Sequence, residues 1–405
     1  LKSVEICVIT RNFQNAMLQG VRVVELATVL AAPTASATLA DFGAEVIKIE
    51  SPGGDGWRKE ARDKGASHGV MFDNANRGKK SVVLDLKKEE DKGLLHQLLA
   101  TADIFITNVT QPALMRLGLD FDAVHPQYPA LIYGHLTAWG RSGPGMERPG
   151  YDVGAFFAGT GIMDIMRSDE AAPPPRYLSG MGDLTTSQQL VAGLALALWH
   201  KERTGKGQLV DACLLRSGLF VQGCTLSMQG FTEARTGRSG YSEEGAKRNP
   251  LRADRTNMFN PCLNNYKSKD GAYFMLTGLE VPRHMPKILK ALKLDRLLPE
   301  IKGFPQNRAM LIKELDQAFA ELTMEQISKA FDAADVWYAP VRKYEDMLHD
   351  EQANACGAFV TVPNVNTKLL ASPVLLSAAD SRPKTRAPLL GEHNDEIFGP
   401  LRSKL

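Results

Sequence analysis

From Gly20 onward, strand-like and helix-like segments alternate along the chain, and this alternation constrains the fold more than any other feature. Five apolar, β-branched stretches predict strands, at residues 21–26, 44–50, 81–86, 102–108 and 130–135. Residues 35–42 and 88–101 have helical spacing, and Gly43 is a suitable residue to end the first helix. Repeated strand–helix–strand units predict a mainly parallel sheet flanked by helices, so the fold class is α/β.

The pattern of predicted elements changes in the rest of the chain. The clearest helix is predicted at residues 185–203, and Gly205 follows it. Residues 229–257 have no sustained periodicity and favour a loop or linker. A hairpin is expected at residues 266–279, and helices are expected at 281–292, 308–320 and 324–334. Strand-like segments follow at 338–341 and 358–362. The last two segments predict that the chain re-enters its first domain.

Composition disfavours several classes of protein. The 405 residues carry 48 Lys and Arg against 46 Asp and Glu, a net charge of +2, which provides no broad basic face for nucleic acid. The five cysteines, at positions 7, 213, 224, 262 and 356, lack the spacing of a disulfide framework or a thiolate zinc site. The longest apolar stretch, residues 190–199, is shorter than the ~20 residues that a membrane helix needs. A globular enzyme of two or three domains is expected, with neither nucleic acid nor a membrane as partner.

Motifs of the commonest enzyme classes are missing from the sequence. The eight histidines show no HExxH or HxH spacing, so no metal site is expected. A GxSxG elbow, a P-loop and a GxGxxG turn after the first strand are also missing. Serine hydrolases, ATPases and nicotinamide-dependent dehydrogenases are therefore disfavoured.

Asp183 is the first candidate for chemistry, because it lies between Gly182 and the strongest predicted helix. An Asp at such a position is most often an N-cap, and the helix dipole favours its ionised form. The glycines at 180 and 182 would let another molecule approach the carboxylate closely. Taken alone, these residues favour a capping role.

Polar turns that follow strands are the second candidate. Residues 74–77, 108–110 and 148–151 are such turns, and ligands of open α/β sheets bind beyond the carboxyl ends of the strands. Four cations near them have the charge to pair with phosphates: Arg77, Lys79, Lys80 and Arg116. Solvated loop charges are the commoner explanation of such residues.

Ordered motifs along most of the chain resemble one family. They include GVRVVELATVLAAP (20–33), LADFGAEVIKIESPGGDGWR (39–58), NRGKKSVVLDLK (76–87), PGYD (149–152), the segment beginning GDLTTSQQ (182–211) and APLLGEHND (387–395). From about residue 17 to 400 the chain is similar to class III coenzyme A transferases, the group of formyl-CoA transferase, carnitine-CoA transferase and the α-methylacyl-CoA racemases.

The resemblance implies a domain organisation. It implies a large Rossmann-like domain built from both termini and a smaller α+β domain, with two such chains interlocked as a homodimer. On this basis residues 17–230 belong to the large CoA-binding domain, residues 231–335 to the small domain with its linkers, and residues 336–405 return to the large domain.

The resemblance also implies site residues. It makes Asp183 the nucleophile, and it places coenzyme A on Leu30, Ala31, Asn74, Ala75, Asn76, Asn108, Val109, Arg116, Arg148, Pro149, Gly150 and Tyr151. Ser51 stands where many members have an arginine that packs on the adenine of CoA. Arg58 and Lys79 are the candidates to make this contact in its place. Backbone N–H groups near residues 159–161 are candidates for stabilising oxyanions.

The implied activity is transfer of CoA from an acyl-CoA donor to a carboxylate acceptor. Asp183 would attack the thioester, form an acyl-aspartyl anhydride and then an aspartyl-CoA thioester, and pass CoA to the acceptor. No metal or other cofactor is expected, since coenzyme A is itself a substrate. The sequence does not identify the donor and acceptor acids, although no glycine-rich loop like that of formyl-CoA transferase occurs within residues 240–265, which disfavours formyl-CoA and oxalate.

Two alternatives remain open from the sequence. A racemase of this group takes its α-proton with a histidine in a GHD element, and this chain has Gly150-Tyr151-Asp152 there. A tyrosine with an ordinary pKa near 10 is a poor base at neutral pH, so the transferase is favoured. The other alternative is an acyl-CoA-binding homologue without catalysis.

Both ends of the sequence carry expectations about processing and location. Residues 1–16 differ from the rest and are expected to be upstream or leader sequence. Ser403-Lys404-Leu405 matches a peroxisomal import signal, with the import receptor as a further partner. A eukaryotic source would make the protein peroxisomal or glycosomal, and a prokaryotic one would make it cytoplasmic.

Overall fold

The computed structural model describes residues 16–60, 68–168, 171–237, 255–379, 381–383 and 385–402. The chain divides into two compact units. Unit 1 comprises Leu1–Asp164, Arg176–Cys224 and Asp350–Leu405, and unit 2 comprises Ile165–Pro175 and Thr225–His349. Residues 1–15 and Ser403–Leu405, on which the expectations about processing and import rest, lie outside the described residues.

Unit 1 is built on a six-stranded sheet in the order β3-β2-β1-β4-β5-β6, and every neighbouring pair is parallel. Its strands are β1 (Arg22–Leu26), β2 (Glu45–Glu50), β3 (Lys80–Val83), β4 (Ile104–Thr107), β5 (Ile132–Thr137) and β6 (Leu209–Cys213). The sequence predicted the first five, whereas β6 was not singled out. The strand order reverses between β1 and β4, which is where open α/β sheets bind ligands.

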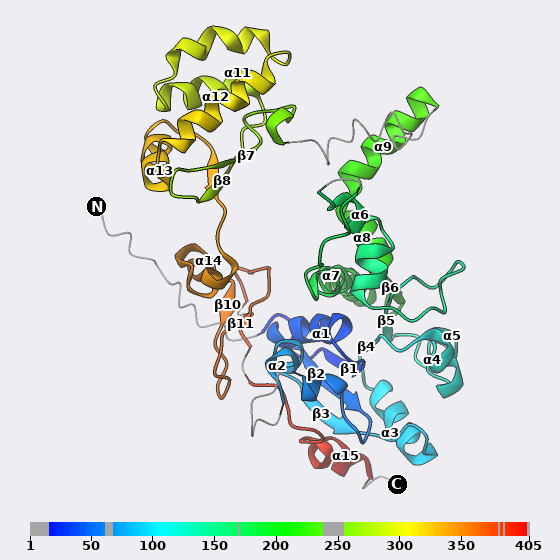
Figure 1. Cartoon of the computed structure of the whole chain (residues 1–405). Helices are drawn as coiled ribbons and strands as arrows, with labels where there is room; N and C mark the ends of the chain where they lie inside the picture. The colour runs from blue at the N-terminus through cyan, green and yellow to red at the C-terminus, as the bar shows by residue number, and fades with distance from the viewer. Residues whose placement is uncertain are drawn as a thin grey trace. The chain divides into compact units, whose positions relative to one another are not determined.

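Helices cover both faces of this sheet (Figure 1). The α-helices that lie wholly in unit 1 are α1 (Ala31–Asp41), α2 (Val70–Asn76), α3 (Glu89–Leu99), α4 (Gln111–Leu117), α5 (Phe121–Val124), α7 (Met181–Thr204), α8 (Leu214–Val221), α14 (Glu351–Ala355) and α15 (Asn394–Arg402). The π-helical segment η2 (Val153–Ala158), the 3₁₀ turn η1 (Gly56–Lys59) and a two-stranded antiparallel sheet of β10 (Phe359–Val360) and β11 (Leu369–Leu370) complete it.

Alternation along the strands builds two apolar cores. Val23 lies on the face that α1 and α7 cover, and its neighbour Val24 lies on the face that α3 and α15 cover. The same alternation occurs in β4, where Ile104 and Phe105 belong to opposite cores. Since strands of a parallel sheet are buried on both faces, these segments read as continuous apolar runs in the sequence.

Unit 2 has its own core. Its antiparallel sheet has the order β7-β8-β9, with β7 (Asn265–Lys267), β8 (Tyr273–Leu276) and β9 (Tyr338–Pro340). Its helices include α11 (Val281–Ala291), η5 (Asp295–Gly303), α12 (Arg308–Ala320) and α13 (Met324–Ala333). The pairing of β7 with β8 confirms the predicted hairpin. Phe274 and Phe319 meet edge to face in the core, with ring centroids 4.9 Å apart.

Several boundaries differ from the sequence-based expectation. Residues 338–341 do not return to the large unit, because β9 pairs with β8, and the return comes at Asp350. The helix α9 (Gly223–Thr236) occupies part of the segment that was expected to be a loop, and residues 238–254 of that segment lie outside the described residues. None of the helices within the described ranges combines the length and apolarity that crossing a bilayer requires.

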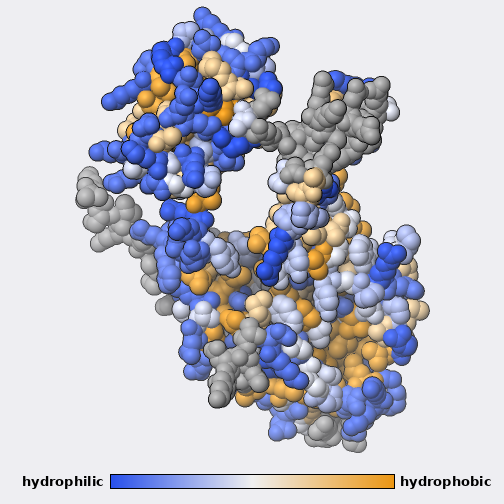
Figure 2. Space-filling view, in the orientation of Figure 1, coloured by the Kyte–Doolittle hydropathy of each residue, from blue (hydrophilic) through white to orange (hydrophobic). Residues whose placement is uncertain are grey.

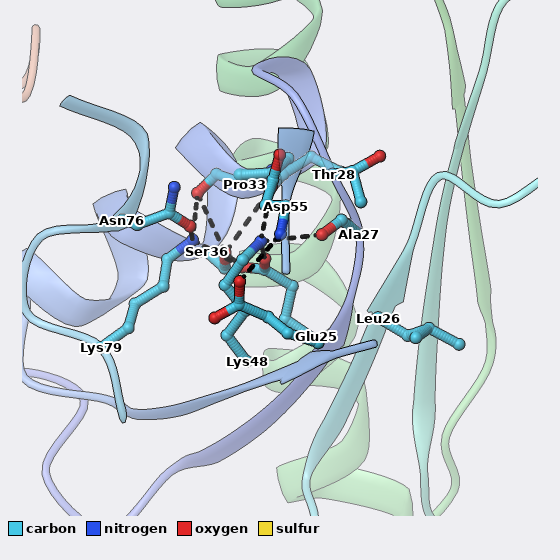
Figure 3. A network of polar contacts seen from close by, with 12 residues as sticks. Glu25, Leu26, Ala27, Thr28, Pro33, Ser36, Lys48, Asp55, Asn76 and Lys79 are labelled. Carbon is cyan, nitrogen blue, oxygen red and sulfur yellow. Dashed lines mark hydrogen bonds and ion pairs between the residues drawn. The ribbon is translucent and has the colours of Figure 1, made fainter. Parts of the chain in front are cut away.

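A buried cluster of charges ties the first half of unit 1 together (Figure 3). Glu25 of β1 accepts hydrogen bonds from Lys48 of β2 at 2.8 Å, from Lys79 at 2.6 Å and from Ser36 of α1. Lys48 also donates to the Ala27 carbonyl at 2.8 Å, and all three charged side chains are fully buried. Burial alone would raise the pKa of Glu25, but the two lysines outweigh it and lower that pKa to about 2.

Replacing Glu25 should destabilise the fold strongly. Glu25→Ala leaves Lys48 and Lys79 buried without their carboxylate, and losing one partner of a buried pair costs about 3–5 kcal/mol. Chemical denaturation followed by circular dichroism would measure this loss. Glu89→Ala breaks the exposed Lys92–Glu89 pair and should change stability by less than about 1 kcal/mol. Equal effects of the two substitutions would contradict the role given to the cluster.

Candidate active site

The site begins at the point where the sheet order reverses. Asn108 follows β4, and its side-chain oxygen accepts from the Thr28 amide at 3.1 Å while its side-chain nitrogen donates to the Thr28 carbonyl at 2.8 Å. These two bonds fasten the carboxyl end of β4 to the turn after β1. The crevice expected of this sheet order is therefore bounded by a braced backbone.

The turn after β1 is held in an unusual conformation. Val29 has φ of 69°, a left-handed value that β-branched residues rarely adopt. Asp55 stabilises it, because its carboxylate lies 3.3 Å from the Val29 amide and also accepts from the Trp57 amide at 3.0 Å. Asp55 is in turn paired with Lys48 at 3.2 Å, so the charge cluster extends to this turn.

The turn continues into direct contact with the start of α7. Leu30 is the N-cap residue of α1, and a Cβ built on Gly180 would lie 2.8 Å from its Cδ2 atom. Gly180 has φ of 80° and is the N-cap residue of α7. Only glycine satisfies both the left-handed backbone and the close approach.

Asp183 lies in the first turn of α7 and makes no capping hydrogen bond there, contrary to the reading of this residue as an N-cap. The preceding Gly182 is buried, and a Cβ on it would come within 2.6 Å of the Phe156 ring and 2.7 Å of the Asp152 Cβ atom. Gly182 therefore lets η2 pack against the first turn of α7. The sequence suggested that this glycine admits another molecule, whereas it admits the protein's own chain.

This packing brings two carboxyl groups together. Asp152 is 5% exposed, and its Oδ2 atom has no hydrogen-bond partner among the described residues. Burial and then the charge of Asp152 raise the pKa of Asp183 to about 7. The N-terminus of a helix favours a carboxylate by only about 0.3–1 kcal/mol, while one pKa unit corresponds to about 1.4 kcal/mol, so burial prevails here.

The predicted CoA-binding residues fall into separate groups. Leu30, Ala31, Asn108 and Val109 lie together at the carboxyl ends of β1 and β4. The carbonyl of Val109 bonds to the His135 ring at 2.9 Å, which fixes the backbone on that side.

A second group lies on α2, where its side chains serve the protein itself. Ala75 and Asn76 are fully buried, and Asn76 accepts from Lys79 at 3.0 Å. Asn74 accepts from the Leu370 amide at 3.1 Å and so holds the C-terminal part of unit 1.

The third group is exposed. Arg148, Pro149, Gly150 and Tyr151 form an exposed loop that leads directly into Asp152, and Arg116 is exposed on α4. Neither arginine has an ion pair within the part of the chain that the structure describes. Both guanidinium groups are therefore free to meet an anionic ligand.

Other predicted roles are wrong. Arg58 is buried and bonds Glu50 at 2.8 and 2.5 Å, and Lys79 is committed to Glu25, so neither can replace the missing adenine-packing arginine at Ser51. Arg77 is likewise paired with Asp41 and Lys80 with Glu45.

The expected oxyanion donors are also engaged. The Gly159 amide donates to Gly154 at 2.7 Å and the Gly161 amide donates to Ala158 at 3.3 Å.

Asp152 was not among the candidate residues, although one signal marked it. An acidic residue directly before the apolar run Val153–Phe157 indicates a carboxylate carried toward the interior. Within the described ranges, no three His, Cys, Asp or Glu side chains are placed to bind a metal. The arrangement places a carboxyl group with a raised pKa, that of Asp183, next to a second carboxyl group.

Comparison with known proteins identifies the family of this chain. A family model described as CoA-transferase family III matches residues 18–394. The (R)-2-hydroxy-4-methylpentanoate CoA-transferase of Clostridioides difficile is 31% identical over 400 residues, covering 95% of each chain. The cinnamoyl-CoA:phenyllactate CoA-transferase of Clostridium sporogenes is 32% identical, over 94% of this chain and 92% of that protein.

A racemase and a solved structure are also similar. The alpha-methylacyl-CoA racemase of Homo sapiens is 28% identical, over 94% of this chain and 92% of the racemase. The structure of a CAIB/BAIF family protein from Brucella suis is 29% identical with a TM-score of 0.77, over 96% of this chain and all of that one. Because the family model spans nearly the whole chain and two relatives exceed 30% identity, the chain belongs to CoA-transferase family III and is an enzyme of that class.

Proposed function

We propose that the protein transfers CoA from an acyl-CoA to a free carboxylic acid, with Asp183 as the covalent nucleophile. The observation that carries this proposal is the environment of Asp183. This residue lies in the first turn of α7 and is not its N-cap residue, it is partly buried, and its pKa is raised. A carboxylate with a pKa near 7 is ionised to a useful extent at neutral pH, yet it is more basic than an exposed aspartate.

The proposed reaction divides one difficult exchange into covalent steps. The Asp183 carboxylate attacks the thioester carbonyl, and the carbon–sulfur bond breaks to give an acyl-aspartyl anhydride and CoA thiolate. The thiolate then attacks the aspartyl carbonyl and releases the donor acid. The acceptor carboxylate attacks the resulting aspartyl-CoA thioester, and the same steps in reverse give the new acyl-CoA. Thioester energy is retained throughout, so ATP is not required.

Coenzyme A is proposed to bind across the carboxyl ends of β1 and β4. The braced backbone at Asn108 supplies a fixed edge for it. Arg116 and Arg148 are exposed cations without ion pairs in the described part of the chain, and we assign them to the phosphates of CoA. No metal or further cofactor enters this scheme.

The two most similar relatives reported above guide the choice of acids. Their names specify (R)-2-hydroxy-4-methylpentanoate and phenyllactate, which both carry a hydroxyl group beside the carboxyl group. Such 2-hydroxy acids therefore belong in any substrate panel for this protein.

A racemase is the second candidate, because racemases are among the relatives and because two carboxyl groups lie together at the site. Racemisation needs a base that reaches the α-carbon. The residue in place of the expected histidine is Tyr151, whose side chain is 67% exposed. A phenol is a poorer base than an imidazole at neutral pH, so this replacement disfavours racemisation.

We further propose that the active protein is an interlocked homodimer. Large apolar side chains of α7 and α8 are exposed in the single chain, with Leu196 71%, Trp199 64% and Phe220 76% exposed. Figure 2 shows apolar residues at the surface of the part that contains α8. Exposed apolar residues of this size on neighbouring helices are typical of protein–protein contacts.

Replacing the nucleophile tests the function directly. Asp183→Asn should lower CoA exchange by roughly a thousandfold or more, because the covalent intermediate cannot form. The variant should also unfold at a higher temperature at pH 8, since a poorly solvated charge is removed. Mass spectrometry of acyl-CoA products from a panel of donors and acceptors would measure exchange.

The controls for this test separate the two candidate reactions. The exposed Asp122 can be replaced by Asn as a matched variant, which should retain full activity. Undiminished exchange in Asp183→Asn would contradict the transferase mechanism. Wash-in of deuterium at the α-carbon of a 2-methylacyl-CoA by the unaltered protein would establish the racemase instead.

The raised pKa of Asp183 predicts the pH dependence of the reaction. The carboxylate is the reactive form, so kcat/KM should fall as the pH is lowered through about 7. Asp152→Asn removes the like charge while leaving the burial, so this acid limb should move to lower pH. Initial rates between pH 5 and 9 measure the shift, and a limb that stays in place would contradict the coupling of the two carboxyl groups.

Light scattering tests the proposed assembly. At micromolar concentration the protein should have twice the mass of the single chain and should show no dissociation on dilution, because interlocked chains separate only by unfolding. A monomer at these concentrations would refute the homodimer.

A further inference from the structure

Asp152 is a buried carboxylate that lacks a partner. The residue is 5% exposed, and its buried Oδ2 atom has no hydrogen-bond partner among the residues that the structure describes. Glu25 and Glu50, which are also buried in unit 1, are satisfied, the first by two lysines and the second by Arg58 and Ser81. An unpartnered charge is unfavourable in such a place, so this position needs a hydrogen-bond donor from elsewhere.

The position of Asp152 indicates where that donor comes from. Its Cβ atom would be 2.7 Å from a Cβ on Gly182, and Gly182 directly precedes Asp183. Its charge acts on Asp183, so the two carboxyl groups share one environment. When Asp183 attacks the carbonyl carbon of an acyl group, a substituent on the adjacent carbon is two bonds from the reacting atom. That substituent is brought to the neighbourhood of Asp152.

Charged groups on the packed elements do not supply the donor. The segment η2 has no charged residue of its own. On the other elements packed against α7, the charged groups are already paired: Asp41 of α1 with Arg77, and Arg216 of α8 with Asp211 of β6. The remaining titratable groups on those elements are Tyr133, His135 and Cys213; Tyr133 donates to Leu119, and His135 contacts Val109 and Arg141. None of these side chains donates to Asp152, so a group on a bound substrate is free to do so.

We propose that Asp152 is a specificity-determining residue that accepts a hydrogen bond from the 2-hydroxyl group of a 2-hydroxyacyl substrate. This inference rests on the proposed transferase function and deepens it by naming the substrate class. Asp152 is acceptor-only when ionised, and a hydroxyl group offers one donor. A hydroxyl also brings no further charge against Phe156, which meets Asp152 at Gly182, whereas an ammonium group would have to lose its water there.

Sites that hydrogen-bond a substrate hydroxyl discriminate strongly against the analogue that lacks it. Such an analogue leaves the buried carboxylate unpaired, and a hydrogen bond to a charged group contributes about 1.5–3 kcal/mol, or roughly ten- to a hundredfold in rate. The unaltered protein should therefore prefer the hydroxylated acid by at least about tenfold in kcat/KM.

The experiment compares three acceptor acids of one carbon skeleton, with the best acyl-CoA donor from the panel. They are 2-hydroxy-4-methylpentanoate, 4-methylpentanoate and 2-amino-4-methylpentanoate, each assayed with the unaltered protein, Asp152→Ala and Asp152→Asn. At pH 9, above the acid limb of every variant, the preference of Asp152→Ala for the hydroxy acid should fall to within about threefold, through loss of rate on the hydroxy acid alone. Asp152→Asn keeps a carbonyl acceptor, so it should retain part of the preference. Asp122→Ala, a matched removal of an exposed acid, should leave all three rates unchanged.

Each outcome supports or overturns the proposal. Equal use of the hydroxy and deoxy acids by the unaltered protein would overturn the role of Asp152 while leaving the transferase function intact. A preference that persists in Asp152→Ala, or a loss shared by all three acids, would show a merely structural role and also overturn it. A preference for 2-amino-4-methylpentanoate would overturn the proposed recognition of a hydroxyl group, because the donor to Asp152 would then be an ammonium group. Failure of every acid and every donor to exchange CoA would overturn both the inference and the proposed function.

Discussion

The buried cluster of Glu25, Lys48 and Lys79 is the constraint on which the rest of unit 1 depends. It joins β1 and β2 to the residue that precedes β3, and it reaches the turn after β1 through Asp55. Three charges in such a place are stable only when each is paired and hydrogen-bonded, so the elements that carry them must meet in one arrangement. The cluster therefore determines geometry more than it adds stability.

The same cluster leads to the active carboxylate by a chain of contacts. Asp55 holds Val29 in its left-handed conformation, and the next residue, Leu30, packs against Gly180 at the start of α7. Asp183 follows three residues later. The rigidity of a buried ion network is thus passed through backbone and close packing to Asp183, which suits the reaction we propose, because that reaction depends on precise approach of a carboxylate oxygen to an acyl carbon.

The chemistry at Asp183 is a balance between two opposing effects. The helix N-terminus favours the charged carboxylate, whereas burial and Asp152 favour the protonated form and prevail. Gly182 makes this possible, because only a residue without a side chain lets η2 bring Asp152 so close. One buried carboxylate without a partner then serves both to tune the nucleophile and, in our proposal, to recognise the substrate.

The sequence by itself determined the α/β class, five of the six strands of the large sheet, the hairpin of unit 2 and the candidacy of Asp183, because strand periodicity and turn residues are local signals. Its motifs also placed the chain in the right family. Tertiary structure alone decided which charges are free: Arg77 and Lys79 were candidates for phosphate contacts in the sequence, yet each is paired with a carboxylate far along the chain. It also moved β9 into unit 2 and brought Asp152 beside Asp183, 31 positions apart by number. Pairings of this kind depend on which surfaces meet after folding, and no local pattern in the sequence encodes them.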